Sequence, residues 1–195
     1  MGFEFLSPVQ ETSGLSMETY QQFHQILENR TVLLNWDVDE TIVENVILPL
    51  KDFENDDSQE PVKLILNTPG GSVADGLVLC NIIDNYKKPL EIYIYGYSCS
   101  MGTIILCAGN NNPNVTKFCY PFSFGLFHSG ETIVGGESTS VDDIIDFNRS
   151  LNSRIREYII NNTNISAEEY DLHNRKQWYL TAEDMKKLGL IDVIL

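Results

Sequence analysis

Short apolar segments alternate with segments of helical periodicity through the middle of this chain. Residues 62–66 and 90–97 are apolar runs of strand length, and residues 72–85 between them form a helical pattern that Ser72 can cap. A strand, a helix and a second strand in this order predict a right-handed βαβ crossover between parallel strands. Short apolar strands of this kind also predict a sheet covered on both faces. The chain is therefore expected to adopt an α/β fold with a mostly parallel sheet.

The flanking segments extend this pattern. Further strands are predicted at 31–34, 117–120, 123–127 and 190–194, and further helices at 18–29, 40–53, 100–108 and 141–161. A capping box at Thr181–Asp184 opens a last short helix that Gly189 ends. Pro49 is expected to kink or end its helix early, before an acidic loop at 54–60. Residues 1–17 show no sustained period and are expected to be a flexible leader, which leaves 18–195 as a single domain.

Composition narrows the class of protein. Of 195 residues, 43% are hydrophobic and 21% charged, which suffices for one domain with a core. The net charge of -15 repels phosphate backbones and argues against a nucleic-acid partner. The N-terminus lacks a signal-peptide pattern, and no segment reaches the roughly 20 apolar residues of a membrane span. A cytoplasmic protein is expected.

The four cysteines support the same location. They are Cys80, Cys99, Cys107 and Cys119, and no two of them have Cys-x-x-Cys spacing. Most lie in apolar runs, where cysteine usually acts as a small hydrophobic residue. We therefore expect reduced thiols, with a disulfide or zinc site as the weaker alternative.

Two glycines, Gly70 and Gly71, lie in the turn 67–72 between a predicted strand and its helix. Glycine lets a ligand approach the backbone amides, so the turn can present N–H groups to a developing oxyanion. Taken alone, the turn is better explained as an ordinary tight connection between a strand and a helix. A phosphate-binding loop is not indicated, because no Gly-Lys-Ser/Thr sequence follows at the required spacing.

Ser100 lies where the strand 90–97 passes into an apolar helix. The N-terminus of a helix offers unpaired N–H groups and the positive end of the helix dipole, and both suit an oxyanion. Taken alone, Ser100 is better explained as a helix N-cap. Among the three histidines, His128 alone ends an apolar strand and precedes small residues, which suits a base at a sheet edge. A structural histidine is the alternative there.

Four motifs, in this order, resemble those of Clp protease proteolytic subunits. Residues 67–73 (NTPGGSV) resemble an N-S-P-G-G-S-V turn, residues 99–102 (CSMG) the A-S-M-G around the family's nucleophile, residues 127–128 (FH) an I-H pair, and residues 179–192 an F-L-T-A-E…G-L-I-D ending. Order and spacing agree from about residue 18 to the C-terminus. Residues 176–179 (KQWY) look most similar to Clp-type proteases encoded by bacteriophages.

The resemblance implies a fold and an assembly. The fold is the type shared by Clp proteases and crotonases, made of repeated ββα and βαβ units with a mostly parallel sheet and a protruding helical handle. The long helix from residue 141 would join two heptameric rings into a tetradecamer. Unfolded polypeptides would be the substrates, fed to the chamber by an AAA+ unfoldase. No cofactor or metal is implied.

The resemblance also assigns roles to residues. Ser100 would be the nucleophile of an acyl-enzyme mechanism and His128 its general base. The N–H groups of Gly71 and Met101 would form the oxyanion hole. An extended substrate would pair with an edge strand at 131–135, and its binding residues would be Gly70, Ile133 and Val134.

The chain departs from the family pattern at the third triad residue. Gln177 stands where the family has aspartate. Its carbonyl oxygen can accept a hydrogen bond from His128 and fix the tautomer, but it brings no charge to stabilise the imidazolium. Asp171 and Glu169 lie nearby in sequence and could substitute only through a different local fold. The sequence His128-Ser129-Gly130 also replaces the family's H-Q-P, and no clear docking signature for an unfoldase stands in residues 1–30.

Three hypotheses follow for the function. The first is a serine peptidase of the Clp type, favoured by the retained Ser100 and His128. The second is a weak or inactive ring subunit that assembles with an active paralogue, favoured by the missing acid. The third is an acyl-CoA enzyme of the related crotonase fold, which needs no Ser–His pair and is disfavoured by the presence of one.

Overall fold

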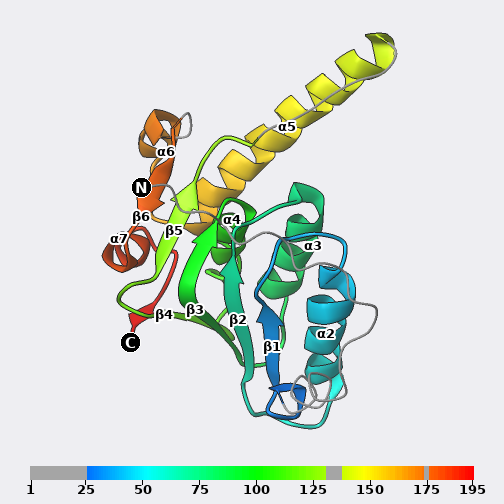
Figure 1. The fold of residues 1–195 in the computed structure, drawn as a ribbon, viewed down its shortest axis with the longest axis vertical. Coiled ribbons are helices and arrows are strands. Elements are labelled where there is room, and N and C mark those ends of the chain that lie inside the picture. The colour runs from blue at the N-terminus through cyan, green and yellow to red at the C-terminus, as the bar shows by residue number, and fades with distance from the viewer. Residues whose placement is uncertain (1–25, 131–137, 174–175) are drawn as a thin grey trace, which may run out of the picture.

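A mostly parallel sheet of seven strands organises the chain in the computed structural model, which describes residues 26–130, 138–173 and 176–195 (Figure 1). The strands are β1 (Thr31–Leu34), β2 (Val62–Thr68), β3 (Leu90–Cys99), β4 (Val115–Cys119), β5 (Phe124–Phe127), β6 (Trp178–Leu180) and β7 (Val193–Ile194). Their order is β1-β2-β3-β4-β7, with β5 paired to β3 and to β6. The predicted α/β fold with a largely parallel sheet is confirmed.

Strand β3 has two partners in succession. Residues 90–94 pair with β4, and residues 97–99 pair with β5, both in parallel. Strand β6 then adds to β5 as the antiparallel edge, with Phe127 opposite Trp178. Because β3 and β5 run side by side in the same direction, the residues that follow them, Ser100 and His128, emerge at the same edge of the sheet.

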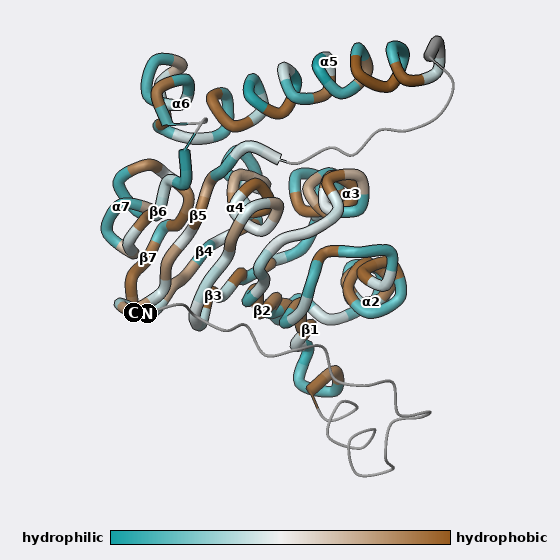
Figure 2. Tube along the Cα trace, turned by 45° about the horizontal axis from the view of Figure 1, so that its top comes forward, coloured by the Kyte–Doolittle hydropathy of each residue, from teal (hydrophilic) through white to brown (hydrophobic). Residues whose placement is uncertain are grey.

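The helices are η1 (Val43–Ile47, a π-helical turn), α2 (Leu48–Asn55), α3 (Val73–Asp84), α4 (Met101–Leu106), α5 (Ser138–Asn162), α6 (Ala167–His173) and α7 (Ala182–Lys187). Helices α2, α3 and α4 lie along one face of the sheet (Figure 2). The strand side chains on that face, among them Leu64, Ile92 and Ile94, are fully buried. Helix α5 runs outward from the body of the molecule (Figure 1).

The other face of the sheet carries aromatic side chains that the described residues do not cover. Tyr95 is 52% exposed and Tyr179 is 58% exposed. Neighbouring rings on adjacent strands stack, with the centroids of Tyr93 and Phe118 4.8 Å apart. Aromatic pairs of this kind bury part of their own surface without a second layer. Within the described part of the chain, the expectation of a sheet covered on both faces is therefore wrong.

Pro49 does not end its helix. The Leu48 N–H donates to the Val43 carbonyl in the wider spacing of a π-turn, and α2 then continues to Asn55. Pro49 thus lies in the first turn of α2, directly after the π-turn. Glu54 consequently lies in the helix rather than in the predicted acidic loop.

Other boundaries agree or differ locally. Ser72 caps α3 by accepting the Asp75 N–H at 3.3 Å, and Thr181 and Asp184 form the predicted capping box of α7. Helix α6 and strand β6 were not predicted. Most of the predicted helix 18–29 lies outside the described residues, as does the leader; residues 26–28 are helical.

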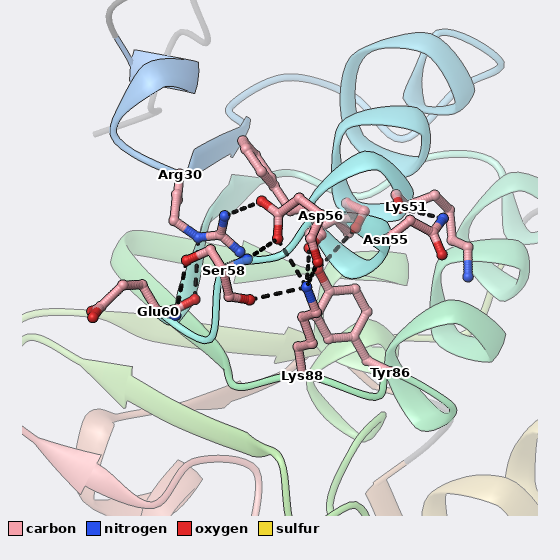
Figure 3. A network of polar contacts seen from close by, with 10 residues as sticks. Arg30, Lys51, Asn55, Asp56, Ser58, Glu60, Tyr86 and Lys88 are labelled. Carbon is pink, nitrogen blue, oxygen red and sulfur yellow. Dashed lines mark hydrogen bonds and ion pairs between the residues drawn. The ribbon is translucent and has the colours of Figure 1, made fainter.

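A group of charged side chains joins the amino ends of β1, β2 and β3, opposite the edge that carries Ser100 (Figure 3). The Lys88 ammonium donates to the Asp56 carboxylate at 2.8 Å and to the Ser58 carbonyl at 2.9 Å. Arg30 donates to the same carboxylate and lies 4.9 Å above the Phe53 ring. These hydrogen bonds hold the pKa of Asp56 at about 2, with Lys88 the larger cause.

Candidate active site

Ser100 sits in a backbone conformation that side chains rarely adopt, with φ 53° and ψ −120°. Its N–H donates to the Leu126 carbonyl of β5 at 2.7 Å, which ties the turn to the neighbouring strand. Ser100 occupies the N-cap position of α4, yet its side chain makes no capping hydrogen bond. A strained residue whose hydroxyl is not used for capping is typical of a functional position. Ser100 therefore occupies the N-cap position without capping α4 through its side chain.

The turn of Gly70 and Gly71 packs directly against Ser100. A Cβ atom on Gly70 would lie 2.6 Å from both the Cys99 carbonyl oxygen and the Ser100 Cβ. Gly70 has φ +101° and Gly71 has φ +144°, which only glycine adopts readily. A Cβ on Gly71 would meet the Val38 carbonyl. Close approach of two backbones, rather than a tight turn alone, therefore explains both glycines.

Two amide groups beside this contact are not used by secondary structure. The bridge between Val38 and the turn uses the Gly70 carbonyl and the Ser72 N–H, and leaves the Gly71 N–H outside it. Met101 is the first residue of α4, so its N–H has no acceptor within the helix. A Cβ on Gly70 would lie only 2.9 Å from the Met101 nitrogen. Both N–H groups can therefore be offered to a ligand.

His128 directly follows β5 and is exposed. Its Nδ1 lies 2.9 Å from the Ser129 carbonyl oxygen. Because a carbonyl only accepts, this contact places the ring proton on Nδ1 and leaves the lone pair of Nε2 available. A neutral histidine in that tautomer can act as a proton acceptor.

Gln177 directly precedes Trp178, the first residue of β6 that pairs with β5. Because Phe127 pairs with Trp178, continuing the antiparallel register places Gln177 opposite His128. Its Oε1 accepts a hydrogen bond from the Tyr179 hydroxyl at 3.2 Å. The Asp171 carboxylate is occupied elsewhere, since it holds Arg156 through two hydrogen bonds of 2.7 and 2.6 Å.

Two buried threonines that the sequence analysis did not single out hold the site together. The Thr68 hydroxyl accepts the Gly70 N–H at 3.1 Å and donates to the Trp36 carbonyl at 2.5 Å, which orients the glycine turn. The Thr103 hydroxyl lies between the Ser98 carbonyl and Leu126. The only hint in the sequence was a polar residue at position 103 within an otherwise apolar helix.

The neighbours of Ser100 offer no competing nucleophile. The Ser98 hydroxyl is fully buried. Cys99 is also buried, and burial raises the pKa of its thiol to about 11, so the thiolate is scarce near neutral pH. The other three cysteines are likewise buried with free thiols. Ile133 and Val134, expected to bind substrate, lie outside the described residues.

Among the described residues, no cluster of three or more His, Cys, Asp or Glu side chains suits a metal ion, and no helix is long and apolar enough to cross a bilayer. In a comparison with known protein families, a family model described as Clp protease matches residues 14–195.

Proposed function

The chain belongs to the Clp protease family, and we propose that it is a serine endopeptidase with Ser100 as nucleophile and His128 as general base. The observation that carries the proposal is the backbone conformation of Ser100. Its hydroxyl makes no capping hydrogen bond, and the residue packs against Gly70. The parallel pairing of β3 and β5 supports the choice of base, because it brings the residues after both strands to one edge.

Acylation would begin when the Ser100 Oγ attacks the scissile carbonyl carbon and its proton passes to His128 Nε2. The carbonyl oxygen becomes an oxyanion that accepts hydrogen bonds from the N–H groups of Gly71 and Met101. The tetrahedral intermediate then collapses as the C–N bond breaks. The leaving amine takes the proton from His128, and the acyl group stays on Ser100 as an ester.

Deacylation repeats these steps with water. His128 takes a proton from a water molecule as its oxygen attacks the ester carbon, and the same N–H groups bind the second oxyanion. The ester bond breaks, the proton returns to the Ser100 oxygen, and the carboxylic acid product leaves. No cofactor is required by this sequence of steps.

We place Gln177 as the third residue of the site, on the strength of the register that sets it opposite His128. Its Oε1 has two lone pairs, so it could accept a hydrogen bond from His128 Nδ1–H while it also accepts the Tyr179 hydroxyl. In the structure the Ser129 carbonyl accepts the Nδ1 hydrogen bond and maintains the same tautomer. Neither acceptor is charged, so we expect slower turnover than in an enzyme with a triad acid.

Our proposal extends to the assembly, as the family resemblance implies: two heptameric rings in the cytoplasm, enclosing unfolded polypeptides supplied by an AAA+ unfoldase. Support comes from α5, which leaves the body of the molecule and exposes Ile144 and Phe147. Exposed apolar side chains on a projecting helix are typical of a contact with another subunit. Gly70, Ile133 and Val134 would align an extended substrate beside Ser100.

A second candidate is a weak or inactive subunit that assembles with an active paralogue. The observation that favours it is the neutral Gln177 at the position of the acid. This candidate and the peptidase differ in one measurable property, namely the reactivity of Ser100.

Labelling with a fluorophosphonate probe at pH 8, followed by mass spectrometry of the assembled protein, tests the proposal. We expect the label on Ser100, no label after Ser100→Ala, and an unchanged rate after Ser98→Ala, because the Ser98 hydroxyl is buried. An unlabelled Ser100 would favour the inactive subunit. A label on Ser98 would mean that the nucleophile is wrongly assigned.

A further inference from the structure

We infer that Thr103 is a positioning residue that couples the nucleophile to the base. The inference rests on the proposed function, since it concerns how Ser100 and His128 are held relative to each other. Thr103 lies in α4, the helix that begins directly after Ser100, and its side chain is fully buried.

The Thr103 hydroxyl makes three close contacts near the carboxyl ends of β3 and β5. Its Oγ1 lies 2.6 Å from the Ser98 carbonyl oxygen and 2.8 Å from the Leu126 carbonyl oxygen. It also accepts the Leu126 N–H at 3.1 Å. The hydroxyl has one proton, which it donates to one of these carbonyls at a time.

The residues that Thr103 contacts lie two positions before each proposed catalytic residue. Ser98 precedes Ser100 by two positions in β3, and Leu126 precedes His128 by two positions in β5. The Leu126 carbonyl also accepts the Ser100 N–H at 2.7 Å. Leu126 is thus bonded both to the nucleophile's backbone and to the nucleophile's helix. A shift of β5 against α4 would have to break both connections.

Ordinary ladder bonds between β3 and β5 would not achieve the same coupling. They fix one strand relative to the other, but they do not hold the first turn of α4, and the Lys117 side chain hydrogen-bonds only to the far end of that helix, at the Leu106 carbonyl. The hydroxyl adds directional bonds from the helix to both strands. Loss of these bonds is expected to displace Ser100 and His128 relative to each other, and misplacement by about 1 Å can cost about 100-fold in rate.

The test compares Thr103→Val, which keeps the shape and removes the hydroxyl, with Thr103→Ser, which keeps the hydroxyl. A control is available in Ser123, another buried hydroxyl, which donates to the Ile94 carbonyl at 2.8 Å and accepts the Tyr120 N–H at 3.2 Å. Ser123 bridges β3 to the turn before β5 but is not connected to α4. Ser123→Ala therefore removes a comparable hydroxyl without touching the coupling.

Fluorophosphonate labelling of Ser100, kcat and KM for a peptide, and the thermal midpoint are measured for all four proteins. We expect Thr103→Val to lower the labelling rate and kcat by about 10- to 100-fold with little change in KM. Thr103→Ser should recover most of this loss, and Ser123→Ala should lower only the thermal midpoint. A parental labelling rate in Thr103→Val, or an equal loss in Ser123→Ala, would overturn the inference. An unlabelled parent protein would overturn the proposed function and this inference with it.

Discussion

Gly70 and Ser100 are in such close contact that a Cβ atom on the glycine would lie 2.6 Å from the serine's own Cβ. Real Cβ atoms do not come so close to a neighbour, and the Cys99 carbonyl oxygen blocks the same space. The strand-to-helix turn after β2 and the one after β3 are therefore built as one unit. The amides of Gly71 and Met101 belong to these two turns, so their relative position depends on this contact.

Substitution at Gly70 should consequently disturb stability and activity together. Gly70→Ala adds a clash with backbone atoms and a side chain at φ +101°, and we expect a loss of about 3 kcal/mol in the free energy of unfolding. Urea denaturation measures this loss. Gly130→Ala is the matched control, because a Cβ there meets nothing within 4 Å. Equal stability of the two variants would contradict the contact.

The charged group at the opposite end of the strands makes a prediction for acid. Lys88 and Arg30 hold the folded pKa of Asp56 at about 2, below its ordinary value of 3.8. The stability that this carboxylate contributes is therefore present above the ordinary value and is lost as the pH falls toward 2. Between pH 5 and pH 2.5, the unfolding free energy should therefore fall less in Asp56→Asn than in the parent protein.

Asp146→Asn serves as the control for acid, since Asp146 and its partner Arg149 have side chains 77% and 76% exposed. Exposed pairs of this kind contribute little to stability. We expect this variant to follow the parent protein across the whole range. A parental acid profile for Asp56→Asn would show that the group in Figure 3 does not stabilise the fold.

The burial of Lys117 leads to a prediction about stability at alkaline pH. Lys117 donates to the Leu106 carbonyl at 2.6 Å, and burial lowers its pKa to about 8 from 10.5. The cost of keeping it charged is present below about pH 8 and disappears as the pH rises toward 10.5. The unfolding free energy of the parent minus that of Lys117→Met should rise by about 3 kcal/mol between pH 7 and 10.5. A constant difference would contradict the lowered pKa.

The candidate site was largely predictable because its parts are local. The two glycines and Ser100 each stand in a short motif at the end of an apolar strand, and His128 ends another. The family resemblance joined these residues into one site, and parallel strands do carry residues that follow them to one edge. The conformation of Ser100 was not predictable, since its positive φ depends on the contacts with Gly70 and Leu126.

Features that depend on residues distant in sequence could not be predicted from the sequence. Strand β6 has only three residues and exists because it pairs with β5. The π-turn before Pro49 could not be recognised from the spacing of the apolar residues. Thr103 looked like one polar residue in an apolar helix, because its acceptors lie in two strands that fold back onto it. In each case tertiary contacts, not local preference, decide the structure.

The projecting part of α5 makes a prediction for assembly. Leu151 and Ile155, toward its C-terminal end, pack on the core, whereas Phe147 is 65% exposed. If α5 joins two rings, Phe147→Asp should convert tetradecamers to single heptamers in native mass spectrometry, because a charge would enter an apolar contact. Ser150→Asp, at an exposed polar position of the same helix, is the control. Monomers or dimers in the parent protein, at every salt concentration, would contradict the proposed assembly.

The last prediction concerns the residue opposite His128. A triad acid sets the histidine tautomer and stabilises the imidazolium, and its neutralisation in trypsin-like enzymes costs about 10⁴-fold in turnover, largely through the wrong tautomer. Here the Ser129 carbonyl already holds the Nδ1 proton, so the enzyme should be slow but active. Gln177→Asp should raise peptide hydrolysis by adding a charge beside the imidazolium, and Gln177→Ala should lower it by much less than 10⁴-fold.

Gln177→Glu tests whether the shorter side chain of aspartate limits the gain. Tyr179→Phe, which removes the hydrogen bond from Tyr179 to the Gln177 Oε1, should not lower the rate. Parental rates in all three Gln177 variants would mean that Gln177 does not act on His128, and that the site is a Ser–His dyad whose tautomer is set by the main chain.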